Sequence, residues 1–144
     1  MKISMKGDYG VRAMIDLAQH YGEGPIQSGE IAARQEIPEP YLDQLLALLR
    51  RAGLLRSVRG PKGGHALSRP PDDVTLAEVV AVLEGSLAPV PCLDDDDCSL
   101  LAVCAQREVW REIEQATQRI LNQTTIAELA RRQSRREARA MYNI

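Results

Sequence analysis

The only three cysteines of the chain lie close together, in the stretch CLDDDDCSLLAVC at positions 92–104. Their spacing is C-x5-C-x5-C, and four aspartates, Asp94–Asp97, separate the first two. Thiolates bind iron–sulfur clusters and zinc, and they also carry disulfide and redox chemistry. This stretch is therefore the first candidate for a site where the protein does chemistry.

The composition of the stretch favours some of these uses over others. A disulfide framework is disfavoured because the number of thiols is odd and nothing indicates secretion. Structural zinc sites usually contain a closer C-x2–4-C pair, and neighbouring aspartates oppose the thiolate that a redox relay needs. Iron–sulfur ligation tolerates varied spacing. The pattern favours a metal cluster, with zinc and thiol chemistry as the open alternatives.

Three thiolates leave one coordination position to be filled. The two histidines, His20 and His65, are distant from the cysteines in sequence. The remaining candidates are a carboxylate from Asp8, Asp94–Asp97 or Glu108, a solvent molecule, or a small ligand. A labile fourth position would suit a sensor, because ligand exchange or oxidation there could destroy the cluster.

The bulk composition predicts one helical domain with an extension. Of 144 residues, 44% are hydrophobic, only 3% are aromatic and none is Phe, so the core must be aliphatic. The apolar runs are too short to cross a bilayer and the N-terminal residues contain no apolar signal region. We therefore expect a cytoplasmic protein with no membrane partner.

The net charge of −2 conceals a strong division along the chain. Residues 50–69 hold six basic side chains and no acidic one, whereas residues 71–106 hold eight acidic side chains and no Lys or Arg. A local basic region in a mildly acidic protein indicates a polyanionic partner at one surface, weakly favouring nucleic acid.

Residues 28–53 predict a helix-turn-helix. A preceding helix is expected over residues 8–21, with an exposed Arg12–Asp16 pair. Ser28 can cap the next helix, and EIPEP at 36–40 forms the turn. The following helix has leucines on its inner face and polar side chains on its outer face, and it ends at Gly53.

A basic hairpin and then a capped helix follow. The strand-like residues around Val58 and Ala66 bracket RGPKGG, which reads as the wing of a winged helix, with Arg59 and Lys62 placed to meet phosphates or a minor groove. Thr75 and Glu78 predict a capping box for the next helix.

A long helix is expected from about residue 105 to about residue 122. Its apolar seam, spaced by four, three and four residues, favours a homodimer contact over packing within the chain. The seam and the tryptophan beside it comprise Val109, Trp110, Ile113, Ala116 and Ile120. Residues 125–144 begin as a short helix and end in an Arg-rich tail.

These observations divide the chain into three parts. Residues 1–84 are predicted to be a winged helix-turn-helix DNA-binding domain and residues 85–105 a cysteine loop. Residues 106–144 are predicted to be the dimerisation helix with its C-terminal tail. The expected fold class is mainly α, with a small β-hairpin as the wing.

The motifs of this chain resemble the Rrf-two family of winged-helix transcription regulators, and in particular its iron–sulfur branch of the IscR and NsrR type. The resemblance rests on MKISMKGDYGVRAMIDLA, EIPEPYLDQLLALLRRAGLL, SVRGPKGGHAL and the cysteine spacing. It implies a homodimer crossed through the long helix, with each half reading one half of a palindromic operator in double-stranded DNA. It also implies that Cys92, Cys98 and Cys104 bind iron.

The resemblance also implies roles at the DNA. Tyr41, Asp43 and Gln44 match residues that face bases, and Arg59 matches a wing residue that enters the minor groove. The residues expected at the DNA are Ser28, Tyr41, Asp43, Gln44, Arg50, Arg59, Gly60, Lys62, Gly63 and Gly64.

The fourth ligand is where this chain departs from part of the family. IscR-type members have a histidine three residues after the last cysteine, and Arg107 stands at that position here. NsrR-type members use an aspartate donated by the partner chain, and Asp8 stands at that place. We therefore expect Asp8 as fourth ligand and a 4Fe-4S cluster, slightly favoured over 2Fe-2S. The alternative role for Asp8 is a helix N-cap.

The combined hypothesis is a DNA-binding transcription regulator, not an enzyme. Its cluster would sense nitric oxide, redox state or iron–sulfur status and set operator affinity. The rival interpretations are a cysteine-based redox or electron-transfer protein and a structural zinc module.

Overall fold

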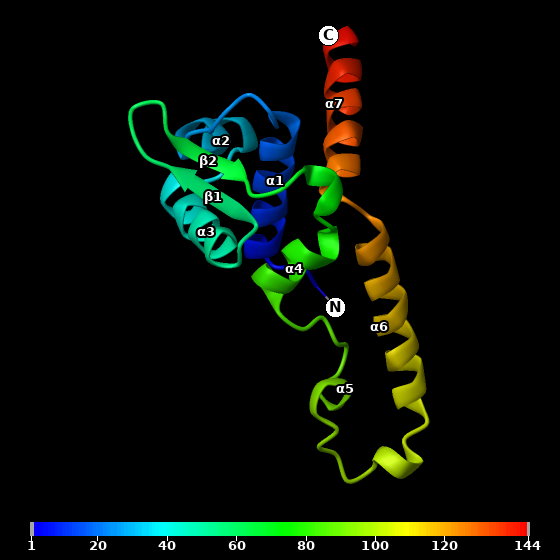
Figure 1. Ribbon diagram of the computed structural model, residues 1–144. Coiled ribbons are helices and arrows are strands. Elements are labelled where there is room, and N and C mark those ends of the chain that lie inside the picture. Colours follow the sequence, from blue (N-terminus) through cyan, green and yellow to red (C-terminus); the bar gives the residue numbers. More distant parts are fainter. Residues whose placement is uncertain (1, 144) are drawn as a thin grey trace.

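The computed structural model describes residues 2–143 and is mostly helical, with one antiparallel two-stranded sheet (Figure 1). Single 3-10 turns lie at Pro71–Asp73 (η1) and Leu101–Val103 (η2). The longer elements are α1 (Met5–Gln19), α2 (Ser28–Gln35), α3 (Glu39–Arg51), β1 (Leu55–Val58), β2 (Gly64–Leu67), α4 (Leu76–Glu84), α5 (Cys92–Asp95), α6 (Gln106–Gln123) and α7 (Ile126–Tyr142).

One aliphatic core joins α1, α2, α3, α4 and the sheet. Met14 of α1, Ile31 of α2 and Val79 of α4 are fully buried in it, and Ile126 brings the start of α7 into the same core. The predicted inner face of α3 is confirmed, because its leucines at 42, 45, 46 and 49 are all buried. The expectation of a helical protein with an aliphatic core is therefore confirmed.

The first helix begins earlier than predicted. Ser4, not a residue near 8, caps α1, since its hydroxyl accepts from the Gly7 amide at 3.3 Å. The capping alternative for Asp8 is therefore wrong. The predicted exposed Arg12–Asp16 pair is also wrong, because Asp16 is fully buried and Arg12 pairs with Asp8 instead.

The helix-turn-helix is present, with one correction at its start. Gln27, not Ser28, is the N-cap of α2, and it forms a reciprocal capping box with Glu30. Glu36 then adopts a left-handed conformation with φ of 54°, which ends α2 sharply. Pro38 caps α3 and Pro40 lies in its first turn, where a missing amide hydrogen costs nothing.

The wing is the predicted hairpin. Leu55 pairs with Leu67 and Val58 with Gly64. A backbone bridge from Ile26 to His65, with N···O distances of 2.9 and 2.7 Å, adds a third short edge to this sheet. The bridge fixes the wing against the entrance to α2, so the wing and the helix-turn-helix are held as one unit.

The start of α4 and the start of α7 are joined by backbone pairing. Thr75 and Thr125 form a bridge, and each caps its own helix through its hydroxyl. The predicted Thr75–Glu78 capping box is only half formed, since the Glu78 carboxylate pairs with Arg69. From Thr125 the chain continues as a single helix to Tyr142, so the expected short helix and tail form one element.

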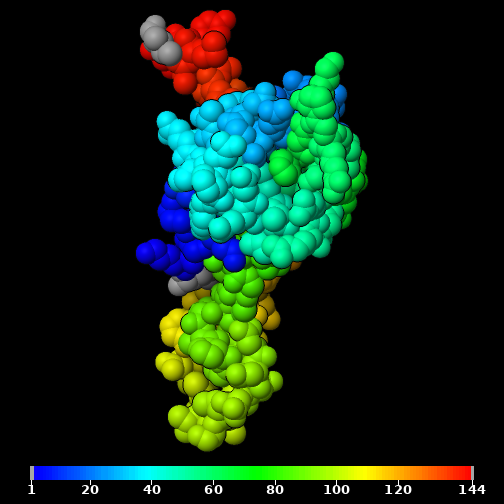
Figure 2. Space-filling view, turned by 90° about the vertical axis from the view of Figure 1, so that its left-hand side faces the viewer, coloured from blue at the N-terminus to red at the C-terminus, as the bar shows by residue number. Residues whose placement is uncertain are grey.

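The cysteine loop and the adjoining part of α6 project away from the winged-helix domain. They form a separate mass below it in Figures 1 and 2. No residue of α6 is buried, which is unusual for an 18-residue helix. Within residues 2–143, no helix is long and apolar enough to cross a membrane.

Candidate DNA interface and cysteine loop

The outer face of α3 is polar and open to solvent. Asp43, Gln44 and Arg50 are exposed, as expected of side chains that read DNA. Tyr41 differs, because it is half-buried and its ring packs edge-to-face on Tyr9 with centroids 5.7 Å apart. The ring of Tyr41 therefore also braces α3 against α1.

The side chains flanking α3 link it to its neighbours. Arg50 Nη1 donates to Ser57 Oγ of β1 at 3.4 Å. The Ser28 hydroxyl lies 3.4 Å from Glu39 Oε1, at the opposite end of α3. Both contacts are long and exposed, so they orient these polar groups more than they stabilise the fold.

The wing turn needs glycine at two positions for steric reasons. A Cβ on Gly63 would lie 2.1 Å from the Val58 carbonyl oxygen, and a Cβ on Gly64 would lie 2.3 Å from the Ile26 carbonyl oxygen. Gly60 has φ of 110°, which other residues rarely adopt. These constraints hold the hairpin in one shape and leave Arg59 and Lys62 exposed at its tip.

His65 lies on β2 of the wing and is half-buried. Burial lowers the pKa of His65, and the nearby Arg50 lowers it further, while Asp43 acts in the opposite direction. The imidazole is therefore neutral at neutral pH. The positive charge of the wing comes from Arg56 on β1 and from Arg59 and Lys62 at the tip.

A buried ion pair that the sequence analysis missed positions α2 against α1. Asp16 accepts hydrogen bonds from Arg34 Nε and Nη2 at 2.9 and 2.8 Å, and from Gln35 Nε2 at 3.0 Å. The hydrogen bonds to Asp16 raise the pKa of Arg34, so the guanidinium stays protonated. A signal was present in the sequence, because Asp16 lies next to Ala13 at the edge of the buried face of α1.

The three cysteines lie in the projecting loop, apart from the outer face of α3 and the wing (Figure 1). Cys92 begins α5, Cys98 is exposed and Cys104 follows η2; all three thiols are free. Among residues 2–143, no three Cys, His, Asp or Glu side chains are gathered as a metal site. The donor set fits an iron–sulfur cluster in its chemistry, since three soft thiolates share one loop with little regular structure to resist closure.

Asp8 is remote from the thiols of its own chain. It lies on α1, where its carboxylate pairs with Arg12 Nη2 at 3.0 Å and remains 45% exposed. Among residues 2–143, the structure therefore gathers neither Asp8 with the cysteines nor the three cysteines into one group.

One polar contact lies within the cysteine loop, and a second residue ties the loop to α6. The Ser86 hydroxyl donates to the Asp94 carboxylate at 2.7 Å. Arg107, where a histidine was noted for IscR-type relatives, donates from Nη2 to the Cys92 carbonyl oxygen at 3.1 Å and pairs with Asp96. Arginine at this position thus holds the loop through its main chain.

The apolar seam of α6 is left uncovered within the chain. Val109, Ile113 and Ile120 are 52%, 39% and 59% exposed, and Trp110 and Ala116 are half-buried. These three large aliphatic side chains form one exposed stripe along α6. Such a stripe is a surface suited to a partner helix.

Comparisons with known proteins agree with this architecture. The family model Rrf2, described as "Iron-dependent Transcriptional regulator", matches residues 3–132. The chain is 43% identical to the transcriptional regulator CymR of Bacillus subtilis over 130 residues, which is 90% of each protein. It is 37% identical to the regulator IscR of Photobacterium profundum over 131 residues, which is 91% of this chain and 76% of that protein.

Solved structures give the same result. The structure of CymR, described as "the Global Cysteine Regulator of B. subtilis", matches with a TM-score of 0.79 and 42% identity over 90% of this chain and 96% of that one. T. potens IscR matches with a TM-score of 0.74 and 44% identity over 91% and 87%. The fold and the relatives together establish that this chain belongs to the Rrf2 family of winged-helix transcriptional regulators.

Proposed function

We propose that this Rrf2 regulator works as a homodimer on a palindromic operator, and that an iron–sulfur cluster held by Cys92, Cys98 and Cys104 sets its DNA affinity. The observation that carries the proposal is the placement of all three thiols in one tethered loop, joined directly to the helix with the uncovered seam. The family likeness to IscR supports the cluster, and the likeness to both relatives supports DNA binding.

The proposed DNA contacts follow from the exposed polar groups. The α3 outer face would lie in the major groove, with Asp43 and Gln44 at base edges, while Arg59 and Lys62 of the wing meet the backbone or the minor groove. The acidic residues of the cysteine loop project away from that face, so their negative charge does not oppose binding (Figure 2).

The proposed coupling runs from the cysteine loop through α6. A bound cluster would tie the three thiols together. Nitric oxide, oxygen or iron scarcity could remove this tie. Asp8 on α1 of the partner is the proposed fourth ligand, since its carboxylate is 45% exposed and is not gathered with the cysteines of its own chain among the described residues. Such a tie would fix the spacing of the two α3 helices, and coupling of this kind is typically worth ~1–3 kcal/mol.

A second candidate is a regulator that responds through the thiols without a cluster. It is favoured by two observations: the thiols are not gathered among the described residues, and CymR, a cysteine regulator by its description, is 43% identical. In that case the same loop would change the dimer through thiol oxidation or modification.

Operator binding with and without the cluster tests the proposal. Genomic fragments selected by anaerobically purified protein would be titrated with that protein and with its chelator-treated form. We expect at least a fivefold difference in affinity, about 1 kcal/mol, and no such difference for Cys98→Ser. Equal affinities for the two wild-type forms would favour the thiol-based candidate.

Substitutions in the wing separate DNA binding from the cysteine chemistry. Arg59→Ala should weaken binding by about tenfold, and Lys62→Ala should reduce the slope of log affinity against log salt by about 0.9 if Lys62 meets one phosphate. Neither change should alter the iron content. Unchanged affinity and slope in both variants would place the DNA elsewhere on the protein.

A further inference from the structure

Arg107, in the first turn of α6, joins both ends of α5 to that helix. Its Nη2 donates to the carbonyl oxygen of Cys92, the first residue of α5, and pairs with Asp96, the residue that caps the end of α5. The Arg107 side chain is only 14% exposed, although neither α6 nor the loop elements α5 and η2 contain a buried residue. The guanidinium is therefore enclosed between the helix and the loop.

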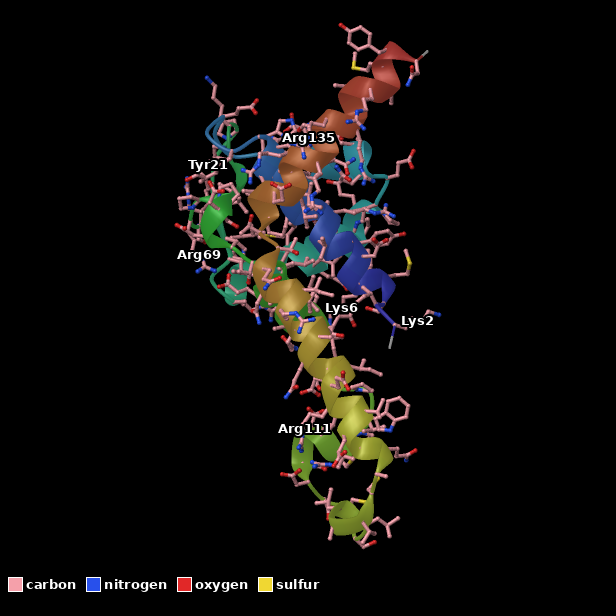
Figure 3. All side chains as sticks on the ribbon, turned by 90° about the vertical axis from the view of Figure 1, so that its right-hand side faces the viewer. Lys2, Lys6, Tyr21, Arg69, Arg111 and Arg135 are labelled. Atoms are coloured by element: carbon pink, nitrogen blue, oxygen red, sulfur yellow. The ribbon has the colours of Figure 1, made fainter. Side chains whose placement is uncertain are left out.

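The same residue connects the segments that carry the first and the last cysteine. Arg107 follows Cys104 by three positions, and the two line one open hollow of about 380 Å³ together with Arg111. Arg111 marks this part of α6 in Figure 3. One end of the Arg107 side chain thus lies beside Cys104 and the other end holds the main chain of Cys92.

The contact with the Cys92 carbonyl is expected to matter more than the ion pair. Asp96 is 74% exposed, so solvent screens its attraction to Arg107. The Cys92 carbonyl is part-buried and also accepts from the Asp96 amide at 3.2 Å, so the charge-assisted bond stabilises the single turn of α5.

Little else fastens the loop to α6. Three atoms on this helix, Arg107 Nε, Trp110 Nε1 and Glu114 Oε2, are buried without a hydrogen-bond partner among the described residues. Their spacing of three and four residues places them on one helical face, the face that Arg107 turns toward the loop. That face also carries the Trp110 ring, but among residues 2–143 Arg107 makes the hydrogen bond and the ion pair that join the loop to α6, so the polar docking of α5 depends on Arg107.

We propose that Arg107 is a positioning residue that holds the Cys92 main chain close to the Cys104 segment before any cofactor binds. We call the contacts of Arg107 with the Cys92 carbonyl oxygen and with Asp96 the Arg107 latch. The latch is a property of the metal-free chain, while its consequence for cluster loading rests on the proposed function. By fixing one ligand backbone in advance, Arg107 lowers the conformational entropy that cluster binding must overcome.

The latch is tested first in the reduced, metal-free full-length protein. Hydrogen exchange of the amides of residues 92–98 and the alkylation rate of Cys92 by iodoacetamide would be measured for wild type, Arg107→Gln, Asp96→Asn and Arg111→Gln. We expect Arg107→Gln to speed both about tenfold and Asp96→Asn to speed them less. Arg111→Gln is the matched control, because Arg111 makes no hydrogen bond or ion pair within residues 2–143, and it should behave as wild type.

Two results would overturn the latch. One is unchanged amide exchange and Cys92 alkylation in Arg107→Gln. The other is an equal acceleration in Arg111→Gln, which would show that loss of positive charge alone causes the effect. Anaerobic reconstitution then tests the consequence, with slower iron and sulfide uptake expected for Arg107→Gln. Wild-type protein that takes up no iron, but shows the expected exchange differences, would contradict the proposed function and leave the latch standing. Normal iron uptake with unchanged exchange in Arg107→Gln would contradict the latch alone.

Discussion

At the scale of single residues, two aspartates of α1 show how burial decides the contribution of an ion pair to stability. Asp16 is fully buried and accepts three hydrogen bonds from Arg34 and Gln35. Asp8, two turns earlier, makes one exposed pair with Arg12. Removing the partner of a buried charge leaves that charge uncompensated, whereas an exposed i,i+4 pair contributes little.

We therefore predict that Arg34→Ala, which leaves the buried Asp16 carboxylate without its charged partner, lowers the free energy of unfolding by about 3 kcal/mol, and that Asp8→Ala lowers it by no more than about 0.5 kcal/mol. Urea denaturation of the metal-free proteins at one fixed concentration measures both. Similar losses in the two variants would show that the Asp16–Arg34 pair does not anchor α2 to α1.

The same scale shows what the sequence could not reveal about the site. Cysteine count and spacing identified the candidate ligands, but the hydrogen bond from Arg107 to the Cys92 carbonyl involves a main-chain atom. No side-chain pattern encodes such a contact. Asp16 was misplaced for a different reason: an Arg at i−4 predicts a surface pair, and only the tertiary position of Arg34 outweighs that preference.

At the scale of elements, the wing depends on its glycines. Gly63 lies where a methyl group would meet the Val58 carbonyl oxygen at 2.1 Å, so the turn must open to accept alanine. Gly29 in α2 is a useful contrast, because a methyl group there would meet nothing closer than 3.5 Å.

We predict that Gly63→Ala weakens operator binding about tenfold while its far-ultraviolet circular dichroism stays unchanged, because the helices do not depend on the wing turn. Gly29→Ala should keep both affinity and helicity. Fluorescence anisotropy with an operator duplex measures the affinity, and wild-type binding by Gly63→Ala would remove the wing from the DNA interface.

Element types were largely predictable and element ends were not. Periodicity located the inner face of α3, and the glycine-rich basic stretch located the wing, since both signals are local. The start of α1 at Met5 depends on the Ser4 hydroxyl, and the choice of Gln27 as cap of α2 depends on a reciprocal bond with Glu30. Several residues near each helix start could cap it, and tertiary packing selects one of them.

At the scale of the whole molecule, the uncovered stripe on α6 is the best candidate for the subunit interface. An 18-residue helix with no buried residue is poorly stabilised within one chain, and its exposed aliphatic side chains favour association. The stripe faces away from the polar side of α6 that holds the cysteine loop, so one helix can serve the dimer and the loop together.

We predict that Ile113→Glu raises the dimer dissociation constant by about a hundredfold or more, because a carboxylate would be desolvated in the seam. Gln118→Glu, on the opposite side of α6, is the matched control and should leave the dimer intact. Sedimentation velocity over a range of concentrations measures both, and a stable Ile113→Glu dimer would place the interface elsewhere.

The most direct test of the central claim is the iron and acid-labile sulfide content per chain of anaerobically purified protein, compared with Cys98→Ser. The account predicts equal iron and sulfide in wild type, near four of each for the Asp8-ligated cluster, with a visible absorption that nitric oxide bleaches, and loss of both from Cys98→Ser. Wild-type protein that contains neither iron nor sulfide, yet still binds its operator, would contradict it.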